Sequence, residues 1–193
     1  MGAQDEVRVE LLDAADARDA RFVEWLTGLV NDVYTTAERG LWREGARRTT
    51  TAEVRSLIAG GEIAVAIRGG RILGSMRFHL VADDASEFGM LVAAPEQRGT
   101  GVGRALVDFA ERRSRELGLR AVGLELLLPL GWRHPVKEFL RAWYGRRGYR
   151  FVRAGAMRDA YPELAPLLAT PCDLAVYEKP LATTPARSPS RAP

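Results

Sequence analysis

Residues 96–106 read EQRGTGVGRAL, a short polar turn rich in glycine between an apolar, strand-like stretch and an amphipathic helix. Gly99, Gly101 and Gly103 carry no Cβ, so the backbone there can turn tightly and expose successive N–H groups. The helix that follows adds its unpaired amides and the positive end of its dipole. This combination predicts a cradle for an anion such as a pyrophosphate.

The glycine spacing argues against two common phosphate-binding motifs. A dinucleotide-binding fingerprint would need its third glycine where Arg104 stands. A Walker loop would need Gly-Lys-Ser/Thr, which is absent here. The spacing therefore disfavours nucleotide-dependent redox chemistry and P-loop chemistry.

Length and composition predict one compact domain. The chain has 193 residues, of which 47% are apolar, enough to build a sizeable core. Residues 183–193, TTPARSPSRAP, lack apolar side chains that could anchor them. We therefore expect a domain over residues 1–182 and a disordered tail over 183–193.

Charge and cysteine content narrow the class of protein further. The formal charge is +3 and only two residues are lysines, Lys137 and Lys179, while acidic residues accompany the arginines nearly everywhere. This pattern disfavours nucleic-acid binding. The single cysteine, Cys172, allows no internal disulfide and no pair of thiolate ligands for a metal. With no signal peptide or membrane-length apolar run, we expect a cytoplasmic protein that needs no metal.

Apolar periodicity predicts alternating strands and helices. Expected strands lie at 7–12, 63–67, 72–80, 87–93, 121–128, 149–154 and 174–179, and expected helices at 17–36, 51–59, 101–117, 135–147 and 162–168. Residues 38–49 lack clean periodicity and are expected to form a loop or short irregular helix that faces a site. The strand at 87–93, the helix at 101–117 and the strand at 121–128 form a βαβ unit, so these two strands should be parallel.

Two motifs in this order resemble the GNAT superfamily of acyl-CoA-dependent N-acyltransferases. The first is Arg-x-x-Gly-x-Gly at residues 98–103, and the second is aromatic-Tyr-x-x-x-Gly-aromatic at residues 143–149, WYGRRGY. The resemblance covers about residues 7–181. It implies a mixed α/β fold whose sheet has six or seven mostly antiparallel strands, a splayed parallel pair at its centre and helices on both faces.

The resemblance also implies acetyl-CoA as the cosubstrate. Its pyrophosphate would lie in the glycine cradle, and its pantetheine arm would hydrogen-bond the backbone of the preceding strand. The implied residues are Leu91, Val92, Ala93, Arg98, Gly99, Thr100, Gly101, Val102, Gly103 and Arg104. Many relatives have an asparagine contacting the coenzyme where this sequence has Lys137, which can still reach a phosphate or pantetheine oxygen.

The same resemblance suggests two catalytic side chains. Tyr144 is the candidate acid that protonates the departing thiolate, with aromatic packing on the coenzyme as its alternative role. Glu87 is the candidate base that takes the amine proton, although ordered water is an alternative acceptor. His79 and His134 are the other candidate bases. The amide of Val92 or a neighbour is expected to polarise the thioester oxygen.

The resemblance implies an acceptor site formed by the loop after the first helix, the hairpin between the last strands and the loop before the second motif. Its candidate residues are Glu38, Trp42, Glu44, Arg47, Arg48, His79, Trp132, Arg133 and His134. The two tryptophans could sandwich an amine-bearing body, and Arg47 or Arg48 could clamp a carboxylate. The alternative is that the tryptophans are packing residues and the arginines are solvated. Residues 159–173 could instead cover the acceptor cleft.

We therefore expect an enzyme that transfers acetyl from acetyl-CoA to a primary amine of a small molecule, an amino acid or amine metabolite, by direct attack. Two alternatives stay open: acyl transfer to a protein amine or aminoacyl-tRNA, and a non-catalytic acyl-CoA-binding domain. The expected partners are acyl-CoA and a small amine, with no membrane. A homodimer through exposed C-terminal strands also stays open.

Overall fold

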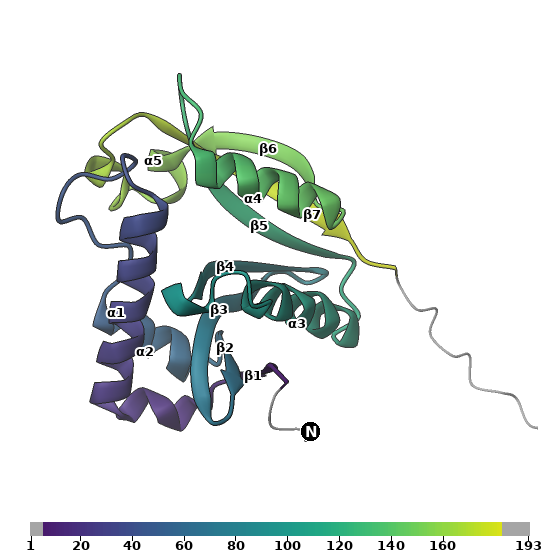
Figure 1. The fold of residues 1–193 in the computed structure, drawn as a ribbon. Helices are drawn as coiled ribbons and strands as arrows, with labels where there is room; N and C mark the ends of the chain where they lie inside the picture. Colours follow the sequence, from purple (N-terminus) through teal and green to yellow (C-terminus); the bar gives the residue numbers. More distant parts are fainter. Residues whose placement is uncertain (1–5, 183–193) are drawn as a thin grey trace, which may run out of the picture.

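The computed structural model describes residues 6–182, and the tail predicted at 183–193 lies outside them. Seven strands form one sheet in the order β1-β2-β3-β4-β5-β7-β6 (Figure 1). The strands are β1 (Arg8–Leu11), β2 (Ile63–Arg68), β3 (Arg71–Ala82), β4 (Ala85–Ala93), β5 (Ala121–Pro129), β6 (Arg150–Ala156) and β7 (Cys172–Pro180). All neighbouring strands are antiparallel except β4 and β5. The predicted mixed α/β fold is confirmed.

Helices cover both faces of the sheet. They are α1 (Ala20–Ala37), α2 (Thr51–Ala59), α3 (Val102–Glu116), α4 (Pro135–Arg146) and the short α5 (Met157–Ala160). One apolar cluster joins α3 and α4 to one face of the sheet, and a second joins α1 and α2 to the other face. The apolar stripes of the four longer helices, α1 to α4, are buried in these two clusters, as their periodicity predicts.

The parallel pair of strands is short, and this creates the central feature of the molecule. Pairing between β4 and β5 covers three positions and ends at Glu87 and Gly123. Both strands continue beyond that point, to Ala93 and Pro129, and they diverge (Figure 1). The backbone edge of β4 that faces β5 is therefore unpaired from Phe88 onward.

The start of α1 differs from the sequence prediction. Residues 17 and 18 belong to a separate 3-10 helix, η1 (Ala14–Arg18), and α1 begins only at Ala20. Two aspartates cause the break, since Asp13 caps the first turn and Asp19 accepts hydrogen bonds from the first amides of α1. Aspartates in those positions favour helix starts over a continuous helix.

A bulge interrupts β4 beside the point of divergence. Met90 has a φ of 47°, which is uncommon for a residue other than glycine. The pairing of β3 with β4 shifts there, because Ser75 lies opposite Val92 while Arg77 lies opposite Gly89. The extra residue puts Met90 and Val92 on the α1 face and Leu91 on the α3 face. Bulges of this kind re-aim a strand and are common beside functional sites.

Gly74 holds β3, β4 and α3 close together, and it gives a first prediction. A Cβ at this position would lie 2.4 Å from the backbone oxygen of Val92 and 2.9 Å from Cγ1 of Val102. Gly74→Ala should therefore lower the free energy of unfolding by about 1–3 kcal/mol, measured by urea denaturation. Gly155→Ala, in open space on β6, is the control and should change it by less than about 0.5 kcal/mol. Equal values for the two variants would contradict the prediction.

Candidate active site

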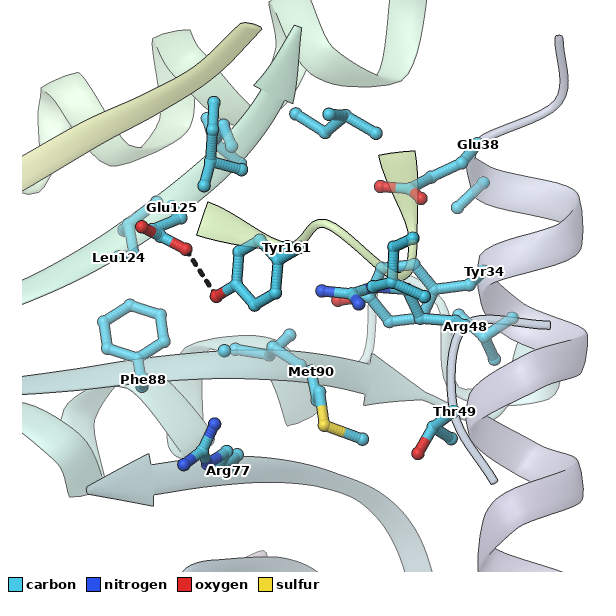
Figure 2. Close-up of a pocket in the computed structure, with 18 of the residues that line it drawn as sticks. Tyr34, Glu38, Arg48, Thr49, Arg77, Phe88, Met90, Leu124, Glu125 and Tyr161 are labelled. Atoms are coloured by element: carbon cyan, nitrogen blue, oxygen red, sulfur yellow. Dashed lines mark hydrogen bonds between the residues drawn. The ribbon is translucent and has the colours of Figure 1, made fainter. Parts of the chain in front are cut away.

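A cavity of about 350 Å³ occupies the gap where β4 and β5 diverge. Its walls come from both strands, the C-terminal end of α1, the inner side of α4, and residues 157–164 (Figure 2). Residues 47–50, which lead into α2, complete the wall beside α1. The volume lies within the range of small-molecule sites.

The cavity connects the two faces of the sheet. Along β4, Phe88 lies on the α4 side, where its ring is 6.0 Å from that of Tyr144. Glu87 precedes it and therefore points to the opposite face. On β5, Leu124 shares the apolar cluster of α4, so Glu125 points to the same face as Glu87. Aromatic and aliphatic groups thus line one mouth, and two carboxylates line the other.

Tyr144 is buried in an aromatic cluster at the α4 side of the cavity. Its ring packs against Phe88, Trp143 and Tyr149, and only 4% of the residue is exposed. Burial raises the pKa of its hydroxyl, with a smaller contribution from Tyr34. The hydroxyl therefore stays protonated near neutral pH and is available as a donor. Its predicted role as the acid stays a prediction.

Glu87 is poised to titrate near neutral pH. Burial, and to a smaller extent the charge of Glu125, raise the pKa of its carboxyl to about 7. Arg77 and Arg153 lower it, but by less. With no ion pair or side-chain hydrogen bond to any residue of 6–182, the carboxylate is free to act on a ligand. A carboxyl in this state suits a general base.

Glu125 and Tyr161 also line the cavity, and the sequence pattern singled out neither, although Tyr161 lies in the segment 159–173 that was considered as a cover for the acceptor cleft. The Tyr161 hydroxyl donates a hydrogen bond to Oε2 of Glu125 at 2.7 Å (Figure 2). Residue 125 is the only charged position in the apolar strand segment 121–128, AVGLELLL, which was the available signal. A charge in a buried strand needs a partner or a function.

Lys137 and Glu38 form a buried ion pair at the cavity wall. Lys137 donates to Oε1 of Glu38, and the indole N–H of Trp42 donates to Oε2. Glu38 is 4% exposed and Lys137 is 5% exposed. The lysine lies two helical turns before Tyr144, on the same side of α4. The predicted coenzyme contact of Lys137 stays a prediction, and the observed partner of its ammonium group is Glu38.

Two arginines and a histidine complete the polar wall. Arg48 stacks over Tyr34, with its guanidinium carbon 5.5 Å from the ring centroid (Figure 2). Arg47 and His79 also line the cavity. Burial lowers the pKa of His79, so its imidazole is neutral at pH 7. Within residues 6–182, its buried Nδ1 has no hydrogen-bond partner.

Trp132 and His134 lie apart from the central cavity. Together with Phe151 and Arg141 they line a separate hollow of about 260 Å³ behind the start of α4. His134 is buried, and its Nε2 lies 3.2 Å from the backbone oxygen of Arg39. The structure therefore places Trp42 and Trp132 in different hollows, where they do not face each other across one cavity. The sequence could not show on which side of α4 this loop would fold.

The glycine turn has the backbone geometry of an anion cradle. Gly99 and Gly101 have φ values of 80° and 91°, which glycine adopts readily, and Gly101 caps α3. In the described part of the chain, the N–H groups of Arg98 and Thr100 close the turn, while those of Gly99 and Gly101 have no backbone acceptor. The first amides of α3 are free as in any helix start. These donors form a site for phosphate oxygens.

Three further observations bear on the chemistry. Within residues 6–182, no group of three or more His, Cys, Asp or Glu side chains is placed to hold a metal ion. None of the helices in that range has the length and apolar character to cross a membrane.

Burial raises the pKa of the Cys172 thiol to about 11, so it stays protonated and is a poor nucleophile.

Comparison with known proteins agrees with this fold. A family model described as the acetyltransferase (GNAT) family matches residues 13–129, more than half of the chain. The chain therefore belongs to the GNAT acetyltransferase family. A search of curated protein sequences gave no match.

Solved structures with the same fold have low sequence identity to this chain. Ard1 from Thermoplasma volcanium is 14% identical, with a TM-score of 0.62 over 91% of this chain and 97% of that one. The ribosomal-protein-S18-alanine N-acetyltransferase from Escherichia coli is 13% identical, with a TM-score of 0.62 over 95% and 99%. The PaiA N-acetyltransferase from Thermoplasma acidophilum, solved in complex with coenzyme A, is 13% identical, with a TM-score of 0.65 over 91% and 99%.

Proposed function

We propose that this protein transfers an acetyl group from acetyl-CoA to the primary amine of a small molecule. The observation that carries this proposal is the pair of groups across the cavity: Glu87, with a pKa raised to about 7, on one side, and the protonated hydroxyl of Tyr144 on the other. A base and an acid at opposite mouths of one cavity suit a reaction that removes a proton from one substrate and delivers one to the other.

Acetyl-CoA would supply an activated acyl thioester. The cradle at residues 98–104 would hold its pyrophosphate with backbone amides, and Arg98 and Arg104 would add positive charge. The unpaired edge of β4 would hydrogen-bond the pantetheine amides in the manner of an added strand. The relative from Thermoplasma acidophilum, solved with coenzyme A, supports this choice of donor.

Two side chains of the cavity would then each carry out one proton transfer. Glu87 takes a proton from the acceptor ammonium, which leaves the nitrogen lone pair free to attack the thioester carbonyl carbon. A backbone N–H near Val92 stabilises the oxyanion. As the C–S bond breaks, Tyr144 gives its proton to the departing thiolate. The products are an N-acetylated amine and coenzyme A with a free thiol.

The cavity favours a small acceptor over a macromolecule. Its volume is about 350 Å³, which suits a ligand of amino-acid size. Two backbone hydrogen bonds close the cavity on the side of residues 157–169. The N–H of Arg43 donates to the carbonyl oxygen of Leu167, and the N–H of Ala169 donates to the carbonyl oxygen of Leu41. Arg47 and Arg48 would bind a carboxylate if the acceptor is an amino acid.

A panel experiment tests the function directly. Purified protein is incubated with acetyl-CoA and a set of amino acids, aromatic amines and ribosomal-protein peptides, and free thiol is measured. We expect acetyl-CoA to raise the melting temperature and at least one small amine to release thiol. If acetyl-CoA changed neither the melting temperature nor the thiol signal, the proposal of acetyl-CoA as donor would be wrong. If only the peptides were acetylated, the proposal of a small-molecule acceptor would be wrong.

The raised pKa of Glu87 gives a prediction for pH. Below pH 7 its carboxyl is protonated and accepts no proton, so kcat/KM of the wild type should rise with pH and level off above about 7. Glu87→Gln should lower kcat/KM by about 100-fold and abolish the rise of kcat/KM below pH 7. Rates are measured from pH 5.5 to 9 with saturating acetyl-CoA. If kcat/KM of the variant rose with pH as in the wild type, Glu87 would not be the base.

A further inference from the structure

Glu125 is the first residue of β5 beyond its pairing with β4 that points to the same face of the sheet as Glu87. Gly123 pairs with Glu87 and is the last paired residue of β5. Because side chains alternate along a strand, Glu125 points to the same face as Glu87, one step deeper into the gap. Both side chains line the cavity. The acceptor mouth therefore holds two carboxylates, of which only one is needed as a base.

Tyr161 fixes one of these two carboxylates and leaves the other free. Its hydroxyl donates to Oε2 of Glu125 at 2.7 Å (Figure 2). Burial and the charge of Glu125 raise the pKa of this hydroxyl, so it remains a donor. Oε1 of Glu125 is left to accept a hydrogen bond from a ligand. The two carboxylates thus differ in what they can do, although their residue type is the same.

The charged groups that shift the pKa of Glu87 come from four different strands. The groups that act on Glu87 are Arg77 from β3, Glu125 from β5, Arg153 from β6 and Glu178 from β7. Of these, Arg77 is already paired with Glu62 at 2.6 Å. Glu178 and Arg153 act on Glu87 without lining the cavity. Of the charged groups that act on Glu87, Glu125 is therefore the carboxylate that lines the cavity with it.

We propose that Glu125, held by Tyr161, binds the ammonium group of the acceptor, and that Glu87 beside it removes the proton. This inference rests on the proposed function and deepens it, because it assigns acceptor binding and acceptor deprotonation to two different carboxylates. Glu125 selects for a cationic amine, and Tyr161 is a positioning residue that acts through Glu125. The rings of Tyr34 and Tyr161 line the same cavity, so the acceptor class is a primary ammonium on a small aromatic or apolar body.

The test measures binding of a cation that cannot be turned over. N,N-dimethylphenethylamine is protonated at neutral pH and forms no stable amide, and phenethyl alcohol is its uncharged counterpart. Dissociation constants are measured by calorimetry in the presence of coenzyme A. The wild type should bind the ammonium at least about tenfold more tightly than the alcohol, and Glu125→Gln should abolish that preference. Tyr161→Phe should weaken ammonium binding by about threefold to tenfold.

Glu178→Gln is the matched control because it removes a charge that acts on Glu87 without lining the cavity. Both Glu125→Gln and Glu178→Gln should move the acidic limb of kcat/KM to lower pH, since each removes a negative charge that raises the pKa of Glu87. Only Glu125→Gln should weaken ammonium binding and raise the amine KM. Thermal unfolding and the affinity for coenzyme A should match the wild type in both variants.

The proposal is overturned if Glu125→Gln keeps the preference for the cation, if Glu178→Gln loses it equally, or if Tyr161→Phe lowers kcat without changing ammonium binding. These outcomes are separate from failure of the proposed function. That failure would appear as absence of acetyl transfer by the wild type to any amine, whereas the binding measurement needs no turnover.

Discussion

Tyr144→Phe should lower kcat by about 1,000-fold while leaving the affinity for acetyl-CoA within about threefold of the wild type. The substitution removes one oxygen and keeps the ring, so packing against Phe88, Trp143 and Tyr149 is preserved. What is lost is the proton for the departing thiolate. The measurement is thiol release at saturating acetyl-CoA, combined with calorimetric titration of acetyl-CoA.

Tyr149→Phe is the matched control for this prediction. Tyr149 belongs to the same aromatic cluster, and its hydroxyl contacts Glu111 at 3.4 Å without lining the cavity. It should keep kcat within a few fold of the wild type. If Tyr144→Phe also kept its kcat, the ring would only pack on the coenzyme and another group would supply the proton.

Lys137→Met should lower the free energy of unfolding by about 3–5 kcal/mol, because it leaves the buried carboxylate of Glu38 without its counter-charge. The indole N–H of Trp42 would still donate to Glu38, but a neutral donor offsets only part of the loss. Urea denaturation followed by tryptophan fluorescence measures the change.

The double variant Lys137→Met/Glu38→Gln separates the ion pair from simple packing. Removing the orphaned charge should recover at least about 1 kcal/mol of the loss, while the glutamine oxygen can still accept from Trp42. Lys179→Met removes a lysine that is 21% exposed and pairs with Glu111, and it should cost less than Lys137→Met because Arg147 still pairs with Glu111. Equal costs for the double variant and for Lys137→Met would show that the aliphatic stem of the lysine matters more than its charge.

Much of the fold could be predicted because its signals are local. The glycine turn at residues 99–103 and the apolar stripe of α3 lie within one continuous segment, and so do the strands on either side of that helix. Periodicity and capping residues identify such segments without knowledge of their neighbours. The parallel pairing of β4 and β5 then follows from the crossover through α3, which returns the chain to the end of the sheet where β4 began.

The acceptor side was harder to predict because its residues meet only through tertiary structure. Tyr161 and Glu125 are 36 residues apart, and their hydrogen bond depends on how residues 157–169 fold over the sheet. The bulge at Met90 changes which side chains face α1, and a strict alternation of side chains would place them on the wrong face. Lys137 had a plausible coenzyme role in the sequence, and only the folded chain shows Glu38 beside it.

Under the proposed function, the residues that would hold the two substrates are also separated along the chain. The walls on the α4 side come from residues 85–144 in the middle of the sequence, whereas the roof of the carboxylate mouth comes from residues 34–50 and 157–169 on either side of that block. The acceptor walls can therefore be altered in sequence while the coenzyme half is left intact. An engineer who wants a new amine substrate from this scaffold would randomise the two flanking segments and leave the central block unchanged.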